Sequence, residues 1–217
     1  MKHILRTLAL PTALAATLVL ASCGTNNDGH GTAGMNGSTG MNGTATGAPA
    51  AGGAPATGAK NKADVEFATM MIPHHAQAVA MAAMAPNQGT DPKVKALAAK
   101  IKEAQAPEIA RMSGWLTGWG APVPDTSGGS GMSGMGGQAG GMMSAQEMTD
   151  LGKATGSGFD RMWLQSMTKH HEGAVDMAKT ELAKGTNPDA KKLAQSIIDS
   201  QSSEIAEMKS ILAGIPG

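Results

Sequence analysis

The chain contains two copies of one segment, and this repeat limits the folds that the chain can adopt. A shift of 96 residues aligns the copies without a gap and places His74-His75 on His170-His171. The match extends into loop residues, where Gly89-Thr90 falls on Gly185-Thr186. Such agreement indicates duplication, so we expect two halves with the same local structure. Other aligned pairs are Asp64 with Asp160, Met71 with Met167, Met81 with Met177, Glu108 with Glu204 and Met112 with Met208.

Each copy has the pattern of two helices joined by a short loop. In the first copy the helices are expected over about residues 63–85 and 92–118. Asp91-Pro92 and its counterpart Asn187-Pro188 combine an N-capping side chain with proline at the first helical position, which is a typical helix start. Two such helix pairs predict an all-α fold, a ferritin-like four-helix bundle with one long crossover.

Two stretches lack the apolar residues that a core needs. Residues 24–59 are mostly Gly, Ala, Thr, Asn and Pro, a composition typical of a disordered, flexible tether. Residues 125–146 form a second, Gly/Ser/Met-rich stretch. The predicted organisation is a signal peptide over 1–22, a disordered tether over 23–60, a first helix pair over 61–118, a flexible linker over 119–146 and a second helix pair over 147–217, with 61–217 as one bundle domain.

The first residues have the pattern of a bacterial lipoprotein signal peptide. Lys2 and Arg6 give a basic start, an apolar run continues to Leu20, and the sequence Leu-Ala-Ser-Cys ends at Cys23. The apolar run is too short to favour spanning a bilayer as a mature helix. We expect cleavage before Cys23, a lipid on its sulfur, and an exported protein anchored to the outer face of a bacterial membrane. A free cysteine in an uncleaved leader is the alternative.

Charge and cysteine content exclude some partners and some stabilising devices. Cys23 is the only cysteine, so no disulfide can form within the chain. Without Lys2 and Arg6 the chain has 15 basic and 17 acidic residues, a net charge of −2. This balance gives no electrostatic attraction for nucleic acid. The fold must therefore be held by packing or by a metal.

Polar side chains lie on helix faces that should be buried. On a helical wheel of about 100° per residue, the apolar stripe of the first helix spans about 120° and includes His74 and His75. On the second helix, Gln105 and Glu108 share the apolar face. An unpartnered buried polar group costs on the order of 1–3 kcal/mol, and a charged group more. These groups and their mates must therefore satisfy one another or bind a metal.

A soft metal ion suits the available donors. Imidazole binds copper, zinc, iron and nickel, while thioether sulfur selects soft ions such as Cu(I). Met71 lies one helical turn before His74 and His75 on the same face. Thioether needs no deprotonation and forms no disulfide in the oxidising space outside the cytoplasm. The sequence therefore predicts a protein that binds copper, expected as Cu(I), with no organic cofactor.

Other interpretations of these residues stay open. Methionine at helical spacing is often only core filling, and a buried histidine is often structural. The glutamates of the second helices are expected to orient imidazole N–H groups rather than bind metal themselves. The aspartates of the first helices either support the site indirectly or are ordinary helix-start acids. The residues expected to act indirectly are Glu108, Glu204, Gln105, Gln201, Asp64 and Asp160.

The methionines of the linker are ambiguous in a similar way. Met132, Met135, Met142 and Met143 either form a loose secondary site for Cu(I) or Ag(I) or belong to a spacer that happens to contain methionine. Composition is the only argument for either interpretation.

The repeated motif resembles a known bacterial family. It reads MMIPHHAQAVAMA in the first copy and MTKHHEGAVDMA in the second, each followed by the pattern Q-x-x-E-I-x-x-M. Over about residues 61–213 this resembles the family called domain of unknown function 305, which implies a ferritin-like, exported or lipid-anchored, copper-associated protein. The copies differ where Ala76-Gln77 stands opposite Glu172-Gly173, so their sites need not be equivalent. The metal ligands implied by the resemblance are His74, His75, Met71, Met81, Met112, His170, His171, Met167, Met177 and Met208.

The predicted function is an extracytoplasmic copper-binding protein that sequesters or transfers Cu(I) through His and Met ligands. Enzyme activity is not expected, because a di-iron oxidase on this fold uses Glu-x-x-His on two helices, and this chain has none. The alternative is a metal-free helical module that docks a membrane or envelope partner, with its glutamates and histidines in a closed polar network. Copper ions and a membrane are the expected partners, and the sequence identifies no protein partner.

Overall fold

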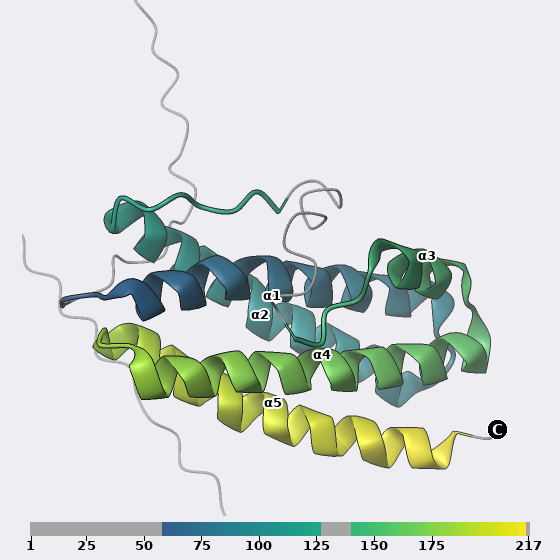
Figure 1. Cartoon of the computed structure of the whole chain (residues 1–217). Coiled ribbons are helices and arrows are strands. Elements are labelled where there is room, and N and C mark those ends of the chain that lie inside the picture. The colour runs from purple at the N-terminus through teal and green to yellow at the C-terminus, as the bar shows by residue number, and fades with distance from the viewer. Residues whose placement is uncertain (1–57, 127–139, 216–217) are drawn as a thin grey trace, which may run out of the picture. The chain divides into compact units, whose positions relative to one another are not determined.

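The computed structural model describes residues 58–126 and 140–215. Every regular element within these ranges is a helix, which confirms the predicted all-α class (Figure 1). Within the same ranges, no helix has the length and apolar character needed to cross a membrane. The helices are α1 (Lys62–Gln88), α2 (Pro92–Gly118), α3 (Ala145–Lys153), α4 (Gly156–Lys184) and α5 (Pro188–Gly214).

Several sequence-based predictions concern residues outside these ranges. They are the signal peptide over 1–22, lipid attachment at Cys23, the tether up to residue 57, and a metal site at Met132 and Met135. All of them stay predictions.

Helices α1 and α4 form the inner pair of the bundle. They run antiparallel and pack directly against each other, while α2 packs on α1 and α5 packs on α4 (Figure 1). Helices α2 and α5 make only a small contact, and the short α3 touches α4. Each half predicted from the repeat is therefore a helical hairpin, and the two hairpins meet through their first helices. This arrangement confirms the predicted four-helix bundle.

Capping side chains set the helix starts that the sequence predicts. Asp91 caps α2 and Asn187 caps α5; each accepts two backbone N–H groups and is followed by proline at the first helical position. Asn61 begins α1 through a capping box. Helix α1 continues past the predicted end at residue 85 to Gln88, with Pro86 in its last turn, and the Gly89 N–H closes that turn on the Ala85 carbonyl.

The end of the predicted linker is placed against the bundle and leads into α3. This short helix was not predicted: it spans the expected boundary between linker and second helix pair at residue 147, and the pair itself, α4 and α5, begins at Gly156. Ser144 and Glu147 form its capping box. The motif Ser-x-x-Glu is visible in the sequence, but the Gly/Met-rich composition around it led to the prediction of a linker there.

Two buried aspartates connect the halves of the bundle. Asp160, near the start of α4, accepts hydrogen bonds of 3.0 and 2.9 Å from backbone N–H groups of residues 90–91 in the α1–α2 loop. Asp64, near the start of α1, accepts hydrogen bonds of 3.0 and 2.8 Å from residues 186–187 in the α4–α5 loop. Each inner helix therefore holds the loop of the opposite half, and these equivalent contacts fix the antiparallel crossing of α1 and α4.

One of these contacts has an additional carboxyl group. Glu181, near the end of α4, is buried beside Asp64, and its counterpart in the first half is Ala85. Burial, and then hydrogen bonding and charge repulsion from Asp64, raise the pKa of Glu181 to about 8. Burial alone would raise the pKa of Asp64. The hydrogen bonds that its carboxylate accepts, first of all from backbone N–H groups, outweigh the effect of burial, so the pKa is lowered. Glu181 therefore keeps a proton at neutral pH while Asp64 is ionised.

Replacing Asp160 by alanine should destabilise the protein. The change leaves the N–H groups of residues 90–91 and the Thr90 hydroxyl without their acceptor. We expect the free energy of unfolding, measured with urea, to fall by about 2–3 kcal/mol. Asp176→Ala, at an exposed position of the same helix, is the matched control and should change it by less than about 0.5 kcal/mol. Equal losses in the two variants would contradict the role of this contact.

The raised pKa of Glu181 makes stability depend on pH. The folded state keeps a proton that the unfolded chain releases, so this contribution is complete below about pH 4.5 and is lost as the pH rises through about 8. Glu181→Gln removes the titration but keeps the shape. The fall in the free energy of unfolding between about pH 7 and 9, measured by urea unfolding, should therefore be smaller in this variant than in the unmodified protein. Unfolded histidines still titrate near pH 7, but they do so in both proteins, so their contribution cancels in the comparison.

The control for this experiment is Glu207→Gln, at an exposed position of α5. Its stability should fall between these pH values as much as that of the unmodified protein. An equally large fall in Glu181→Gln would mean that the buried carboxyl is not protonated in the folded state.

Candidate functional site

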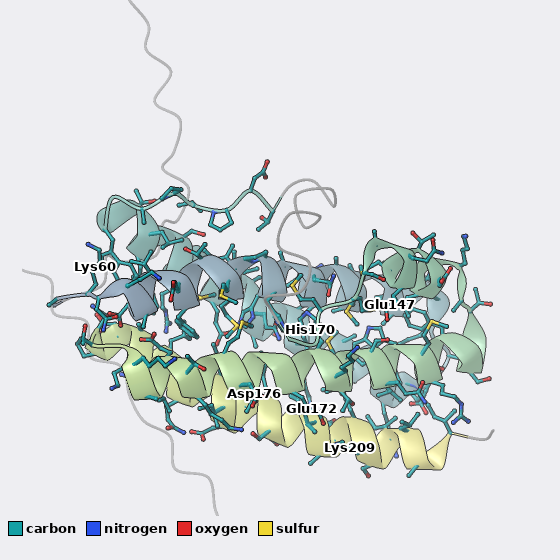
Figure 2. All side chains as sticks on the ribbon, in the orientation of Figure 1. Lys60, Glu147, His170, Glu172, Asp176 and Lys209 are labelled. Carbon is teal, nitrogen blue, oxygen red and sulfur yellow. The ribbon has the colours of Figure 1, made fainter. Side chains whose placement is uncertain are left out.

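Four histidines are buried where α1 and α4 cross. His74, His75, His170 and His171 are each at most 1% exposed. The rings of His74 and His170 meet across the crossing, with centroids 3.7 Å apart and planes inclined by 41°. Figure 2 labels His170 between the two helices. The structure therefore brings the predicted histidines of both halves together in the interior.

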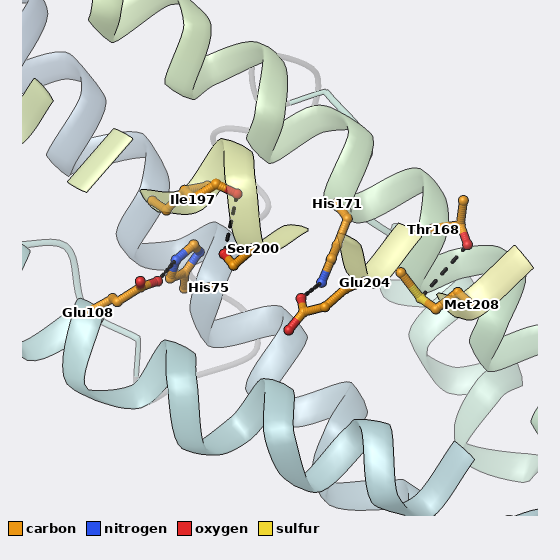
Figure 3. Close-up of polar contacts among 8 residues, drawn as sticks. All are labelled: His75, Glu108, Thr168, His171, Ile197, Ser200, Glu204 and Met208. Carbon is orange, nitrogen blue, oxygen red and sulfur yellow. Dashed lines mark hydrogen bonds and ion pairs between the residues drawn. The ribbon is translucent and has the colours of Figure 1, made fainter. Parts of the chain in front are cut away.

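A glutamate from the outer helix of each half holds the second histidine of its pair. His75 Nε2 lies 2.8 Å from Glu108 Oε2, and His171 Nε2 lies 2.7 Å from Glu204 Oε2 (Figure 3). A carboxylate oxygen accepts hydrogen bonds, so each Nε2 carries a proton, and the tautomer that this contact favours has its lone pair on Nδ1. Both glutamates thus contact the histidines that they are predicted to orient, and the orienting role itself stays a prediction.

A backbone segment between the linker and α3 contacts the first half of the site. We call residues 140–143 the strap. His74 Nε2 donates to the Gly140 carbonyl at 3.2 Å. The side-chain amide of Gln77 donates to the carbonyl of Met143 and accepts from its N–H, both at 2.8 Å. A carbonyl only accepts, so His74 also carries its proton on Nε2 and its lone pair on Nδ1.

Five imidazole nitrogens in the cluster have no hydrogen-bond partner among the described residues. They are Nδ1 of all four histidines and Nε2 of His170. Burial, and then the neighbouring imidazoles, lower the pKa of His74 to about 3 and that of His170 well below its usual range. Both rings are therefore neutral at physiological pH. Each unsatisfied group costs roughly 1–3 kcal/mol, and a cation bound to their lone pairs would remove part of that cost.

The six predicted methionine ligands form two groups on either side of the histidines. Five of them are fully buried, and Met177 is half-buried. Each group combines two methionines from one half with one from the other. Because each first helix carries one methionine before its histidines and one after, the imidazoles lie between the groups. The first group is Met71, Met112 and Met177, and the second is Met81, Met167 and Met208.

The second methionine group has neighbours that the first does not share. The Thr168 hydroxyl lies 3.8 Å from Met208 Sδ (Figure 3), whereas the counterpart of Thr168 in the first half is Ile72. Met143 of the strap also packs against the core around the second group. The two ends of the site therefore differ chemically, although the helices that build them are repeats.

The structure accounts for the other predicted supporting residues in different ways. Asp64 and Asp160 bind loop N–H groups at the two ends of the inner helices, as described above. Gln105 and Gln201 are buried one turn before the glutamates, and their Oε1 atoms have no donor in the described part of the chain. In that part, no three side chains of His, Cys, Asp and Glu are placed to hold a metal ion. The core offers imidazole nitrogen together with thioether sulfur.

The contact of the strap and Gln77 with the histidine site is what sequence reasoning missed. Met142 and Met143 of the strap were named only as candidates for a separate linker site for Cu(I) or Ag(I), which stays a prediction. The repeat aligns Gln77 with Gly173, and this difference was visible as a departure between the copies. A glycine at position 173 could have indicated that a backbone segment packs against α4 beside the second histidine pair.

Comparison with known proteins identifies the family. Residues 64–212 match the family described as domain of unknown function DUF305. The chain belongs to the DUF305 family. This confirms the resemblance inferred from the repeated His-His motif. A search of the curated proteins finds no match.

Several solved structures are similar to this chain. A DUF305 protein from Streptomyces coelicolor, described as a predicted secreted protein, is 37% identical with a TM-score of 0.62, over 70% of this chain and 93% of that chain. A DUF305 fragment from Deinococcus radiodurans is 30% identical with a TM-score of 0.60, over 74% and 99%. CopM in the Cu(I)-bound form is 34% identical with a TM-score of 0.59, over 71% and 98%, and its Cu(II)-bound and Ag-bound forms also match.

Removing the carboxylate of Glu204 should leave the His171 N–H buried without an acceptor. We expect Glu204→Ala to lower the free energy of unfolding by about 1–3 kcal/mol, and Glu204→Gln, which keeps an oxygen acceptor, to lower it less. Urea unfolding gives both values. Glu207→Ala, at an exposed position of α5, is the matched control. A loss in Glu204→Ala no larger than in the control would show that this contact does not orient His171.

Proposed function

We propose that this DUF305 protein binds copper outside the cytoplasm and takes up Cu(I) through imidazole nitrogen and thioether sulfur. The observation that carries the proposal is the set of five buried imidazole nitrogens without partners, which lie between two groups of methionines. Neutral imidazole and thioether both bind copper, and thioether favours the softer Cu(I) ion. Neither has to release a proton at neutral pH before it binds.

The contacts around the histidines support this proposal. In metal sites, a histidine ligand commonly donates its other ring N–H to a carboxylate or a backbone carbonyl, which fixes the tautomer and strengthens the ligand. His75 and His171 have such a contact with a glutamate, and His74 has one with the Gly140 carbonyl. Three of the four rings are thus already held with Nδ1 as the available donor atom.

The comparisons support the same ion class. CopM binds Cu(I), Cu(II) and Ag in its solved structures, and it is about one third identical to this chain over nearly its whole length. Ag(I), like Cu(I), is a soft monovalent ion that thioether sulfur accepts. The similarity supports copper in general, and the buried thioether sulfurs are the reason to propose Cu(I), held as cargo.

We further propose sequestration or transfer of copper, rather than catalysis, as the role. The chain has no Glu-x-x-His motif of the kind that builds di-iron oxidase sites in such bundles. Export is proposed from the leader sequence, with Cys23 as the lipid attachment site, and the relative described as secreted supports it. In that space a set of ligands without thiols avoids oxidation to disulfides.

Titration with Cu(I) and a competing chelator, under anaerobic reducing conditions, tests the proposal. We expect the double variants His74→Ala/His75→Ala and His170→Ala/His171→Ala each to weaken Cu(I) binding by at least about tenfold, equivalent to about 1.4 kcal/mol. Cu(I) should also raise the melting midpoint of the unmodified protein, because a ligand that binds only the native state stabilises it.

Methionine variants provide the matched comparison. Met167→Leu keeps the apolar volume but removes a buried sulfur, so it should weaken binding, whereas Met162→Leu, at a position 36% exposed, should not. Full Cu(I) binding in a variant lacking all four core histidines would overturn the proposal. An unchanged melting midpoint of the unmodified protein would favour the metal-free docking module instead.

A further inference from the structure

The strap contacts the two halves of the histidine site in different ways. On α1 it is held by the side chain of Gln77. On α4, at the aligned position, Gly173 leaves space for it: a Cβ there would lie 1.6 Å from the Gly140 carbonyl oxygen. The backbones of the strap and of α4 are therefore in direct contact, and the contact requires glycine at position 173.

A second glycine allows the strap to lie this close. Gly141 has a φ of +85°, a left-handed conformation that other residues rarely adopt. A Cβ at this position would also lie 2.2 Å from the Lys169 carbonyl oxygen. Two independent constraints, one on each side of the contact, thus place the Gly140 carbonyl beside the crossing of α1 and α4.

The Gly140 carbonyl accepts from His74, and no described group does the same for His170. His74 Nε2 donates to it at 3.2 Å, while both ring nitrogens of His170 lack a hydrogen-bond partner in the described ranges. The two rings face each other with centroids 3.7 Å apart. They are equivalent in the repeat, but the strap carbonyl accepts from only one of them, His74.

We propose that the strap is a positioning element of this site, which fixes His74 as the Nε2–H tautomer so that its Nδ1 is always the donor atom offered to a cation. Gln77 and Gly173 are the positioning residues, because one clamps the strap and the other leaves room for it. The part of this inference that concerns a soft monovalent cation rests on the proposed function, whereas the part that concerns the tautomer does not.

Long-range ¹H–¹⁵N NMR of the histidine rings tests the tautomer directly in the metal-free protein. In the unmodified protein, His74 should show a protonated Nε2 and an unprotonated Nδ1. Gln77→Ala releases the clamp and Gly173→Ala pushes the strap away, so in both variants the two nitrogen shifts of His74 should move toward each other. His75 and His171, held by their own glutamates, should keep their shifts and serve as internal references.

Two matched variants control for the chemistry of the substitutions. Gly158→Ala introduces the same methyl group on α4, at a position where no atom lies within 4 Å of the new Cβ. Gln165→Ala removes an exposed glutamine from the same helix. Both should leave the His74 shifts unchanged. Gln77→Ala adds no bulk, so it keeps the test decisive if Gly173→Ala does not fold.

Titration with Ag(I) or Cu(I) is the second readout. A neutral hydrogen bond biases a two-state equilibrium by roughly two- to tenfold, so Gln77→Ala and Gly173→Ala should weaken cation binding by about that factor, and the control variants should not. Unchanged His74 shifts in both strap variants, or a proton on Nδ1 in the unmodified protein, would overturn the inference. If the NMR shifts change as expected but neither the unmodified protein nor any variant binds Ag(I) or Cu(I), the role of the strap is supported and the copper proposal is contradicted.

Discussion

The antiparallel crossing of α1 and α4 is the constraint on which the rest of the structure depends. Asp160 and Asp64 hold it at its two ends by binding loops of the opposite half. Because the halves are repeats, the crossing brings aligned positions together at its centre, where His74 meets His170. One hairpin alone carries two histidines, and the crossing makes a cluster of four. It also mixes the methionines, so that each group takes sulfur from both halves.

The polar groups at this crossing are only partly satisfied by the protein. The glutamates on α2 and α5 each occupy one nitrogen of one ring, and the strap occupies one nitrogen of His74. The remaining nitrogens are buried without partners among the described residues. A half-satisfied polar network in a core is less stable than an apolar core of the same shape. Sequences break such rules chiefly at functional sites, which is why the cluster and not the surrounding apolar core indicates function.

The fold was predictable because its signals are local or periodic. The caps Asp91 and Asn187 can be recognised from the residues that follow them in sequence. A helical wheel shows that the histidines, and separately the glutamates, lie on the apolar faces of their own helices. The contacts between the halves were not predictable in this way. Nothing near Asp64 in sequence shows that residues 186–187 lie beside it. The strap was missed because its contact with α4 depends on glycines, which have no side chain to indicate packing. A glycine-rich segment has the same composition whether it is a spacer or packs against the fold.

Some of the differences between the two copies of the repeat fall on groups that touch the crossing or its ends. Gln77 stands opposite Gly173, Ile72 opposite Thr168, and Ala85 opposite Glu181. A strictly symmetric pair of hairpins would offer a cation two identical sets of donors. Here the strap accepts a hydrogen bond from a histidine of the first pair, and the Thr168 hydroxyl lies beside a methionine of only one group. Sets of donors with different neighbours have different affinities. On the proposed function, the two ends of the site would therefore offer a cation unequal sets of donors, although the helices that carry them are repeats.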